Sequence, residues 1–213
     1  MDALRSGALV IACGALAHEI AALRRINGWA ALAVQCLPPE LHNSPEQIPG
    51  RVRDAICSAR ERYAKIFVAY ADCGTGGRLD ALLQAEGVER LPGAHCYEFY
   101  ATAQRFSELA AQELGTFYLT DFLVRHFERL VVQTLGIDRH PELISEYFRN
   151  YRRVVYLVQD QAQSDVPQAA AIAARLGLEF AVQLTGYGAL ETSLRQVVER
   201  PAEQRIEWAA WPR

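Results

Sequence analysis

The sequence predicts an α/β fold in which a mostly parallel sheet carries helices on both faces, a Rossmann-like three-layer arrangement. Short apolar runs that end in glycine or proline turns alternate with stretches of helical spacing along most of the chain. The clearest strand opens the stretch 65–77, where an apolar run leads into Asp-Cys-Gly-Thr-Gly-Gly. A continuous apolar run is typical of a parallel strand buried on both faces. Because ligands of open α/β sheets bind at the carboxyl ends of the strands, we expect the functional site there.

Each expected strand is a short apolar run bounded by turn residues. Asn27-Gly28 precedes the second strand and Pro38-Pro39 ends it. The expected strands lie at residues 8–14, 29–37, the start of 65–77, 88–91, 153–159 and 178–184.

The expected helices are amphipathic. Leu16, Ile20 and Leu23 share one face of the first helix, and Thr120-Asp121 is a capping pair for a later one. The helices are expected at residues 15–26, 51–63, 79–86, 97–114 with a break near Ala103, 120–135, 142–150, 167–176 and 189–199.

The domain organisation predicted from the sequence is a single α/β domain over residues 1–213. The chain is 51% hydrophobic and 22% charged, which suits one globular core. Residues 103–150 are expected to form a helical insertion between strands. The tail, residues 200–213, carries Trp208 and Trp211, whose apolar surface favours docking on the body or on a second chain, so a homodimer is plausible.

Composition excludes several classes of partner and location. The net charge of −3 and the lack of a basic run argue against nucleic-acid binding. The first apolar stretch, residues 8–17, is too short to span a bilayer and lacks the basic start of a signal peptide, so we expect no membrane partner and a cytoplasmic location. In that compartment the five cysteines favour metal binding or catalysis over disulfides.

Three of the cysteines are predicted to meet at one edge of the sheet. Cys13, Cys73 and Cys96 follow short apolar or turn segments, and neighbouring parallel strands are about 5 Å apart. Sulfur and imidazole ligands suit zinc, or iron in a thiolate-rich site. His42, in the loop after the second strand, is the candidate fourth ligand. There is no Cys-x-x-Cys pair, so this prediction depends on strand order rather than on spacing.

The remaining candidate residues have supporting or structural roles. Cys36 and Cys57 are expected to be inert core residues. His18 and Glu19 lie early in the first helix and are expected on a solvated face, with Glu19 kept as a candidate that faces the same crevice. The candidates for the layer around the ligands, or for contacts to a substrate, are His95, Glu19, Gly74, Gly76, Tyr97 and Glu98.

Two other chemistries stay open. The glycines between Gly74 and Gly77 could cradle a phosphate, but neither G-x-G-x-x-G nor a P-loop pattern is present. Alternatively, Cys73 is a metal-free nucleophile of a transferase or hydrolase, activated by His42 or His95, with its thiol pKa lowered by the following helix start.

Several motifs resemble those of a known family: residues 11–16 (IACGAL), 41–46 (LHNSPE), 70–76 (YADCGTG), 95–100 (HCYEFY) and 117–120 (FYLT). Together, over residues 8–160, they resemble a bacterial and archaeal family catalogued only as a domain of unknown function and often encoded near corrinoid-dependent methyltransferases of one-carbon metabolism. The resemblance implies a shared site at Cys13, His42, Cys73 and Cys96. Many relatives carry His-Asp-Cys where this chain has Ala-His-Cys, so it assigns no role to His95.

The gene neighbourhood of that family points toward corrinoid or methyl-transfer chemistry, with a corrinoid as a further cofactor. A thiolate-rich zinc with an open position would suit a bound thiol or methyl acceptor. A second implication is a non-catalytic partner or cofactor carrier for corrinoid proteins. In that case Gly74–Gly77 and the aromatics at 97–100 would line a binding face for a small molecule or a corrinoid protein.

Overall fold

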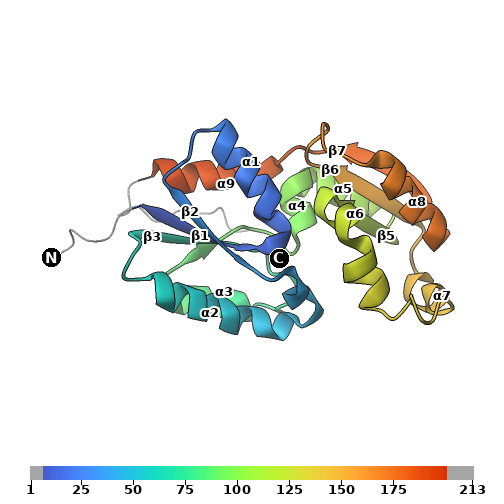
Figure 1. The fold of residues 1–213 in the computed structure, drawn as a ribbon, viewed down its shortest axis with the longest axis horizontal. Coiled ribbons are helices and arrows are strands. Elements are labelled where there is room, and N and C mark those ends of the chain that lie inside the picture. Colours follow the sequence, from blue (N-terminus) through green and yellow to red (C-terminus); the bar gives the residue numbers. More distant parts are fainter. Residues whose placement is uncertain (1–6, 201–213) are drawn as a thin grey trace. The chain divides into compact units, whose positions relative to one another are not determined.

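The computed structural model describes residues 7–200, and these form two compact units. The first unit comprises the chain up to Phe99 together with the segment that starts at Ala189, and the second unit is Tyr100–Gly188. Each unit has its own parallel sheet with helices around it (Figure 1). The predicted α/β class with parallel strands is therefore confirmed, although the strands form two sheets where one was expected.

The sheet of the first unit has the order β2-β1-β3-β4, and all its strands are parallel. The central strand β1 pairs on one side with β2 from Ala8↔Leu32 onward and on the other with β3 from Ala8↔Lys65 onward. The interior of β1 is buried on both faces, which explains its continuous apolar sequence. The bounds are β1 (Ala8–Cys13), β2 (Leu32–Leu37), β3 (Lys65–Ala69) and β4 (Glu89–Arg90).

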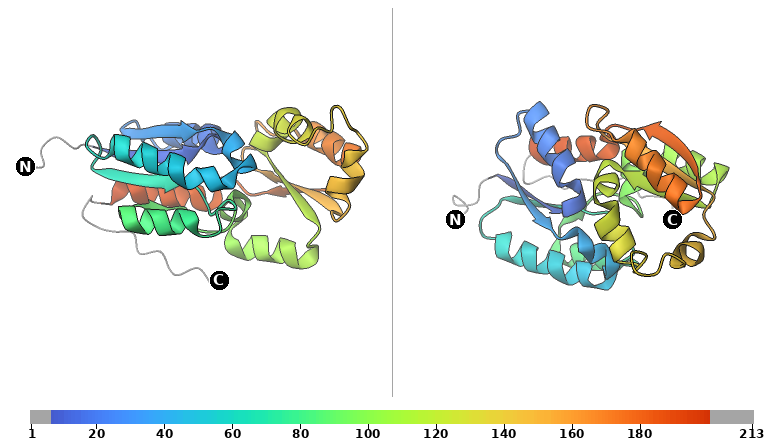
Figure 2. Two further views of the ribbon diagram at one scale, coloured as in Figure 1. Left: turned by 90° about the horizontal axis from the view of Figure 1, so that it is seen from below. Right: turned by 45° about the vertical axis from the view of Figure 1, so that its right-hand side comes forward.

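Helices cover both faces of this sheet. Figures 1 and 2 show α1 and α9 on one face and α2 and α3 on the other. The 3₁₀ turns η1, η2 and η3 lie in the loops that follow β1 and β2, and the division between the units falls within α4. The bounds are η1 (Gly14–Leu16), α1 (Ala17–Ile26), η2 (Pro39–Asn43), η3 (Pro45–Gln47), α2 (Ile48–Ala59), α3 (Arg78–Glu86), α4 (Cys96–Ala101) and α9 (Gly188–Glu199).

The last helix, α9, returns to the first unit through specific polar contacts. Lys65, the only lysine of the sequence, donates from Nζ to the carbonyl oxygens of Val197 at 2.6 Å and Arg200 at 2.5 Å. These carbonyls end α9, where a cation is favoured by the helix dipole. At the other face of α9, Arg195 donates to Oδ1 of Asn27 at 2.8 Å.

The sheet of the second unit has the order β5-β6-β7 and is also parallel. Phe117 and Leu119 point to the face that holds the apolar cluster with α6 and α8, and Tyr118 points to the other face, where it meets Phe106 of α5 at 5.1 Å between ring centroids. The bounds are α5 (Ala103–Gln112), β5 (Thr116–Thr120), α6 (Asp121–Phe127), the π-helical segment η4 (Glu128–Gln133), α7 (Leu143–Phe148), β6 (Arg153–Val158), α8 (Val166–Leu176) and β7 (Glu179–Leu184).

The insertion expected at 103–150 contains the helices α5, α6 and α7, and it also contains a strand, β5, which was not predicted. This strand has five residues, Thr-Phe-Tyr-Leu-Thr, which favour a strand, and it pairs along its whole length with β6. The predicted break near Ala103 is confirmed at Thr102, which caps α5 by accepting from the Arg105 amide. The tail with Trp208 and Trp211 lies outside the described residues, and the single-domain expectation stays a prediction.

A buried carboxylate organises the carboxyl edge of the second sheet. Asp121 is 3% exposed and accepts from Tyr156 Oη at 2.6 Å, from the Asp160 amide at 2.8 Å and from the Gln159 amide at 3.2 Å. In return, Oε1 of Gln159 accepts from the Asp121 amide at 2.8 Å. This network ties the start of α6 to the loop after β6. The sequence suggested only a helix cap here.

Replacing Asp121 with alanine should lower the free energy of unfolding by about 2–4 kcal/mol, because it leaves two buried amides and a buried hydroxyl without their acceptor. Asp138→Ala, at an exposed position of the same unit, is the matched control and should change it by less than about 0.5 kcal/mol. Urea unfolding followed by circular dichroism measures both. Equal midpoints for the two variants would show that the network adds nothing to stability.

Candidate functional site

The candidate site lies at the carboxyl edge of the first sheet, between β1 and β3. The chain leaves β1 toward β2 on one side, and β3 lies on the other side, so the strand order reverses at this point. Loops that leave the sheet in opposite directions open a crevice outside the strand ends. Cys13 ends β1, and the loop after β3 carries Cys73, so the fold brings the two predicted cysteines to this switch point.

Cys13 is buried, with 4% exposure, and ends the strand as the cap of η1. Its sulfur accepts from the Ala15 amide at 3.3 Å. Burial raises the pKa of the thiol to about 12, against the opposing effect of this amide, and the nearby charge of Cys73 raises it further. Cys13 is therefore a neutral thiol at neutral pH.

Cys73 has a left-handed backbone conformation, with φ 51°. Two backbone hydrogen bonds hold it beside the loop after β4: the Asp72 amide donates to Gly93 O at 3.1 Å, and the Cys73 amide donates to Ala94 O at 2.9 Å. Burial raises the pKa of the Cys73 thiol to about 11. The expectation that a helix start would lower this pKa is wrong, because α3 begins only at Arg78 and burial is the largest effect.

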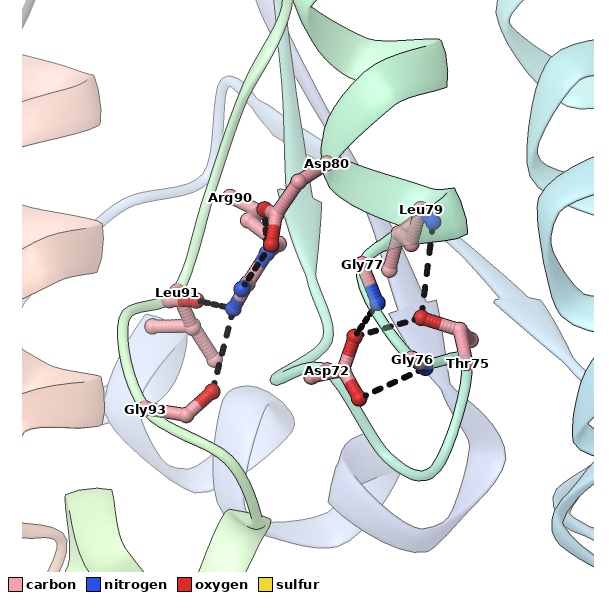
Figure 3. Close-up of polar contacts among 9 residues, drawn as sticks. All are labelled: Asp72, Thr75, Gly76, Gly77, Leu79, Asp80, Arg90, Leu91 and Gly93. Carbon is pink, nitrogen blue, oxygen red and sulfur yellow. Dashed lines mark hydrogen bonds and ion pairs between the residues drawn. The ribbon is translucent and has the colours of Figure 1, made fainter. Parts of the chain in front are cut away.

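The loop after Cys73 is shaped by the carboxylate of Asp72 (Figure 3). Oδ1 accepts from Thr75 Oγ1 at 2.6 Å and from the Gly77 amide at 2.9 Å, and Oδ2 accepts from the Gly76 amide at 3.1 Å. Burial alone would raise the Asp72 pKa, but these hydrogen bonds and the charge of Arg90 outweigh it and lower the pKa. The amides that a phosphate cradle would need are thus occupied by the chain's own carboxylate, which argues against the nucleotide alternative.

The loop that carries Cys96 is fixed by Arg90. Its guanidinium forms a bidentate pair with Asp80 at 2.6 and 2.9 Å and donates to Leu91 O at 2.6 Å and Gly93 O at 3.2 Å (Figure 3). Cys96 then begins α4. The residue as a whole is only partly buried, but burial of its thiol raises its pKa well above the ordinary value, and the charges of Cys73 and Cys13 add to the rise.

His42 lies in η2, the turn after β2, as predicted, and meets Cys13. Its Nδ1 is 3.8 Å from Cys13 Sγ and 3.0 Å from Pro39 O. The imidazole stacks on the ring of Tyr70, with 6.1 Å between centroids and 11° between planes. Although the residue as a whole is exposed, desolvation of the ring lowers its pKa, and the charge of His95 adds to this. The ring is therefore neutral at neutral pH, as a metal ligand must be.

Close backbone approaches interlock the loops of the site. A Cβ on Gly14 would lie 2.9 Å from Pro39 Cδ and 3.0 Å from Leu37 O, so only glycine fits beside the loop that carries His42. Gly74, with φ +83°, has Pro45 3.6 Å from its would-be Cβ position. The loops after β1, β2 and β3 therefore pack on one another, and the donors they carry are held in one place.

The residues expected around the ligands differ in burial. Glu19 is 4% exposed, so the expected solvated face is wrong for it, whereas His18 is exposed. Glu98 is also buried and accepts from the Ala94 amide at 2.8 Å, which shapes the turn before Cys96. His95 is exposed and contacts Tyr97, with 6.4 Å between ring centroids.

Cys36 and Cys57 are exposed, so the expectation that both are core residues is wrong. Cys36 lies on β2, an edge strand with one open side, and Cys57 lies on the solvent side of α2 next to the buried Ile56. Consecutive side chains of a helix point about 100° apart. A residue next to a buried one in the sequence, such as Cys57, can therefore be exposed. In the run at 97–100, Phe99 and Tyr100 are buried and cannot form part of an exposed binding face.

Tyr70, the residue directly after β3, was not predicted as a site residue. It is 1% exposed, and its hydroxyl lies beside the Cys13 thiol, with which it forms a weak hydrogen bond outside ordinary geometry. Burial raises the pKa of this phenol, and the neighbouring Cys13 raises it further. Its place directly after a buried strand, next to the cysteine turn, was the available signal.

The described part of the chain, residues 7–200, has no group of three or more His, Cys, Asp or Glu side chains in an arrangement that could hold a metal ion. The fold gathers the predicted donors at one edge without placing them in coordinating positions. In the same residues no helix has both the length and the apolar character needed to cross a membrane.

Comparison with known proteins identifies the family. The sequence profile described as "Protein of unknown function (DUF1638)" matches residues 36–194, which is more than half of the chain. The chain belongs to this family. The predicted resemblance to a family of unknown function is thus confirmed, and the matched region includes His42, Cys73 and Cys96 but begins after Cys13. No curated protein and no solved structure matches the chain significantly.

Asp72→Ala should destabilise the first unit by about 1.5–3 kcal/mol, because Thr75 and the amides of Gly76 and Gly77 lose their acceptor. The effect should shrink as the pH falls below the ordinary carboxyl pKa of 3.8, since the lowered pKa stabilises the fold only while Asp72 is ionised. Chemical unfolding at pH 7 and pH 3 measures it. Asp54→Ala, exposed on α2, is the control, and a loss as small as the control's would contradict this role.

Metal-free protein should lose stability as the pH rises above about 9. The folded-state pKa values of Cys13 (about 12) and Cys73 (about 11) exceed the ordinary value of 9.0, so the folded state holds these protons more tightly. This stabilisation is complete below pH 9 and is lost between pH 9 and 12. Thermal unfolding in a chelator at pH 8 to 11 measures it. Cys73→Ser should flatten the decline and Cys57→Ser should not; identical profiles would contradict the burial argument.

Proposed function

We propose that the first unit binds a thiophilic metal ion, zinc or iron, through the thiolates of Cys13, Cys73 and Cys96, with His42 as the fourth donor. The observation that carries the proposal is the contact between Cys13 Sγ and His42 Nδ1, 3.8 Å apart, which two separate loops bring together at the edge of the sheet. The charge of Cys73 raises the pKa of both Cys13 and Cys96, and Cys13 also raises that of Cys96. Charge effects of this kind require thiols that lie near one another, although the exposed Cys36 also raises the pKa of Cys13. Three sulfurs with one imidazole suit zinc or iron.

The spacing between Cys13 and His42 supports their sharing an ion. Ligands at about 2.3 Å for sulfur and about 2.0 Å for nitrogen on a tetrahedral ion lie roughly 3.5 Å apart. The Cys13 Sγ to His42 Nδ1 distance is 3.8 Å, so a small movement brings the pair to a ligating separation. When Nδ1 carries the ring proton, it donates to Pro39 O; when the proton is on Nε2, Nδ1 is free to ligate. Ion binding therefore exchanges the Pro39 contact for a metal bond.

The pKa values of the thiols set the proton balance of binding. All three are protonated at neutral pH, and metal ligation requires thiolates, so binding releases up to three protons. Affinity should therefore rise steeply with pH. The same values argue against the metal-free alternative, because a thiol with a pKa of about 11 is a poor nucleophile at neutral pH.

The placement of this centre in corrinoid or one-carbon methyl metabolism depends only on the resemblance of the motifs. In the first alternative, a thiolate-bound ion with an open position would bind a thiol or methyl acceptor. In the second, the protein is a carrier that would bind the corrinoid itself. Titration with cobalamin followed by absorbance tests the second of these separately from the metal proposal.

Protein purified without a tag should contain close to one zinc or iron per chain by elemental analysis. Cys73→Ser should lose most of this metal, because it removes one of the proposed thiolate ligands. Cys57→Ser keeps all the proposed ligands and should retain the wild-type content. Metal-free wild-type protein that takes up neither ion, or Cys73→Ser with full metal content, would overturn the proposal.

A further inference from the structure

The last strand of the second sheet, β7, is apolar in sequence yet largely open to solvent. It lies at the edge of the sheet and reads Glu-Phe-Ala-Val-Gln-Leu (Figure 1). Val182 and Leu184 are 47% and 56% exposed, whereas their partners in β6, Tyr156 and Val158, are almost completely buried. The apolar cover of the sheet therefore stops before the carboxyl half of β7. A partner that covered this half would remove apolar surface from water, which is favourable.

Among the strands of residues 7–200, β7 has the most exposed edge. It pairs with β6 alone, and four of its six residues are exposed. The opposite edge strand, β5, has no exposed residue, and β2, at the edge of the first sheet, exposes Cys36 alone. Proteins usually protect open edges with lysine, proline, a bulge or a very short strand. β7 has none of these, and Glu179 at its start is its only charged residue, so its edge is suited to strand addition.

The hydrogen bonds to β6 show which residues of β7 face the open edge. The amides of Glu179 and Thr185 donate to carbonyl oxygens of the β6 segment at 3.1 and 3.0 Å. Backbone groups of successive strand residues point in alternate directions. The N–H and C=O groups of Phe180, Val182 and Leu184 therefore point away from β6, along the same edge that exposes the apolar side chains.

We propose that β7 pairs in antiparallel orientation with β7 of a second copy of this chain, about a twofold axis at Val182. In this register Val182 lies opposite the same residue of the second copy, and Phe180 lies opposite Leu184. Each outward N–H and C=O of β7 then has a backbone partner. On the other face, Ala181 lies opposite Gln183, whose Nε2 now donates to Leu184 O at 3.0 Å in place of a neighbouring strand. The pairing joins the three-stranded sheets of the two copies.

The strand is complementary to its own copy, as a twofold interface requires. The Val–Val pair and the two Phe–Leu pairs lie on one face, and apolar cross-strand pairs of this kind stabilise antiparallel sheets. The two copies of Glu179 lie at opposite ends of the paired strands, roughly 20 Å apart, because six residues at about 3.4 Å each separate them. No like charges meet along the pair. This interface is independent of the proposed metal centre.

Sedimentation equilibrium of the full chain at about 1 to 200 μM tests the proposal, and wild type should show a monomer–dimer equilibrium in this range. Val182→Lys places two ammonium groups opposite each other, so the dissociation constant of the dimer should rise at least about tenfold. Leu114→Lys is the matched control, since Leu114 is 90% exposed in the same unit and lies outside β7. It should leave the dissociation constant unchanged. Far-UV circular dichroism shows that each variant is folded.

A mixture of two charge variants tests the register. Val182→Lys and Val182→Glu should each be monomeric alone, and their equimolar mixture should form a heterodimer, because the twofold axis sets residue 182 opposite its own copy. Three results would overturn the inference: a wild-type chain that stays monomeric, a dimer that Val182→Lys does not weaken, or a mixture that stays monomeric. The second result would assign the interface to another surface, such as the tail with Trp208 and Trp211.

Discussion

The cost of burying an ionised sulfur controls what the edge of the first sheet can do. An uncompensated charge in a water-poor site takes a proton and becomes neutral, and Cys13, Cys73 and Cys96 all respond in this way. Each thiolate would also repel the next. Only a bound cation, or a comparable positive group, makes three thiolates in this space stable. The chemistry of the site therefore depends on what supplies that positive charge.

The three loops that carry the cysteines are fixed by contacts of their own. Asp72 folds the cysteine turn on itself, Arg90 fixes the loop before Cys96, and Gly14 lets the turn after β1 touch the loop that carries His42. These contacts are polar or backbone contacts that do not use the sulfur atoms. These contacts fix the loops without the thiols of Cys73 and Cys96, whereas the Cys13 sulfur accepts from the Ala15 amide and His42 Nδ1 contacts Pro39 O.

Much of the first unit could be predicted from the sequence, because buried parallel strands leave a local apolar pattern. Cys13 and Cys73 were placed at one edge since both follow such strands. The strand β5 was missed although its residues favour a strand, because it is only five residues long and lies directly between two helices. Nor could the exposure of Cys36, which depends on β2 being an edge strand. Tyr70 looked like one more apolar strand residue, and only its buried position beside Cys13 and His42 distinguishes it.

The left-handed backbone of Cys73 reduces the stability that this turn contributes to the fold. It is one of two non-glycine residues with a positive φ in the described part of the chain, and both its neighbour Gly74 and the later Gly76 show how easily glycine takes that shape. A side chain there costs roughly 1 kcal/mol relative to glycine. A glycine at this position would let the turn form without backbone strain. The cysteine is therefore present against the local backbone preference. Strain of this kind is typical of positions that serve a task other than folding.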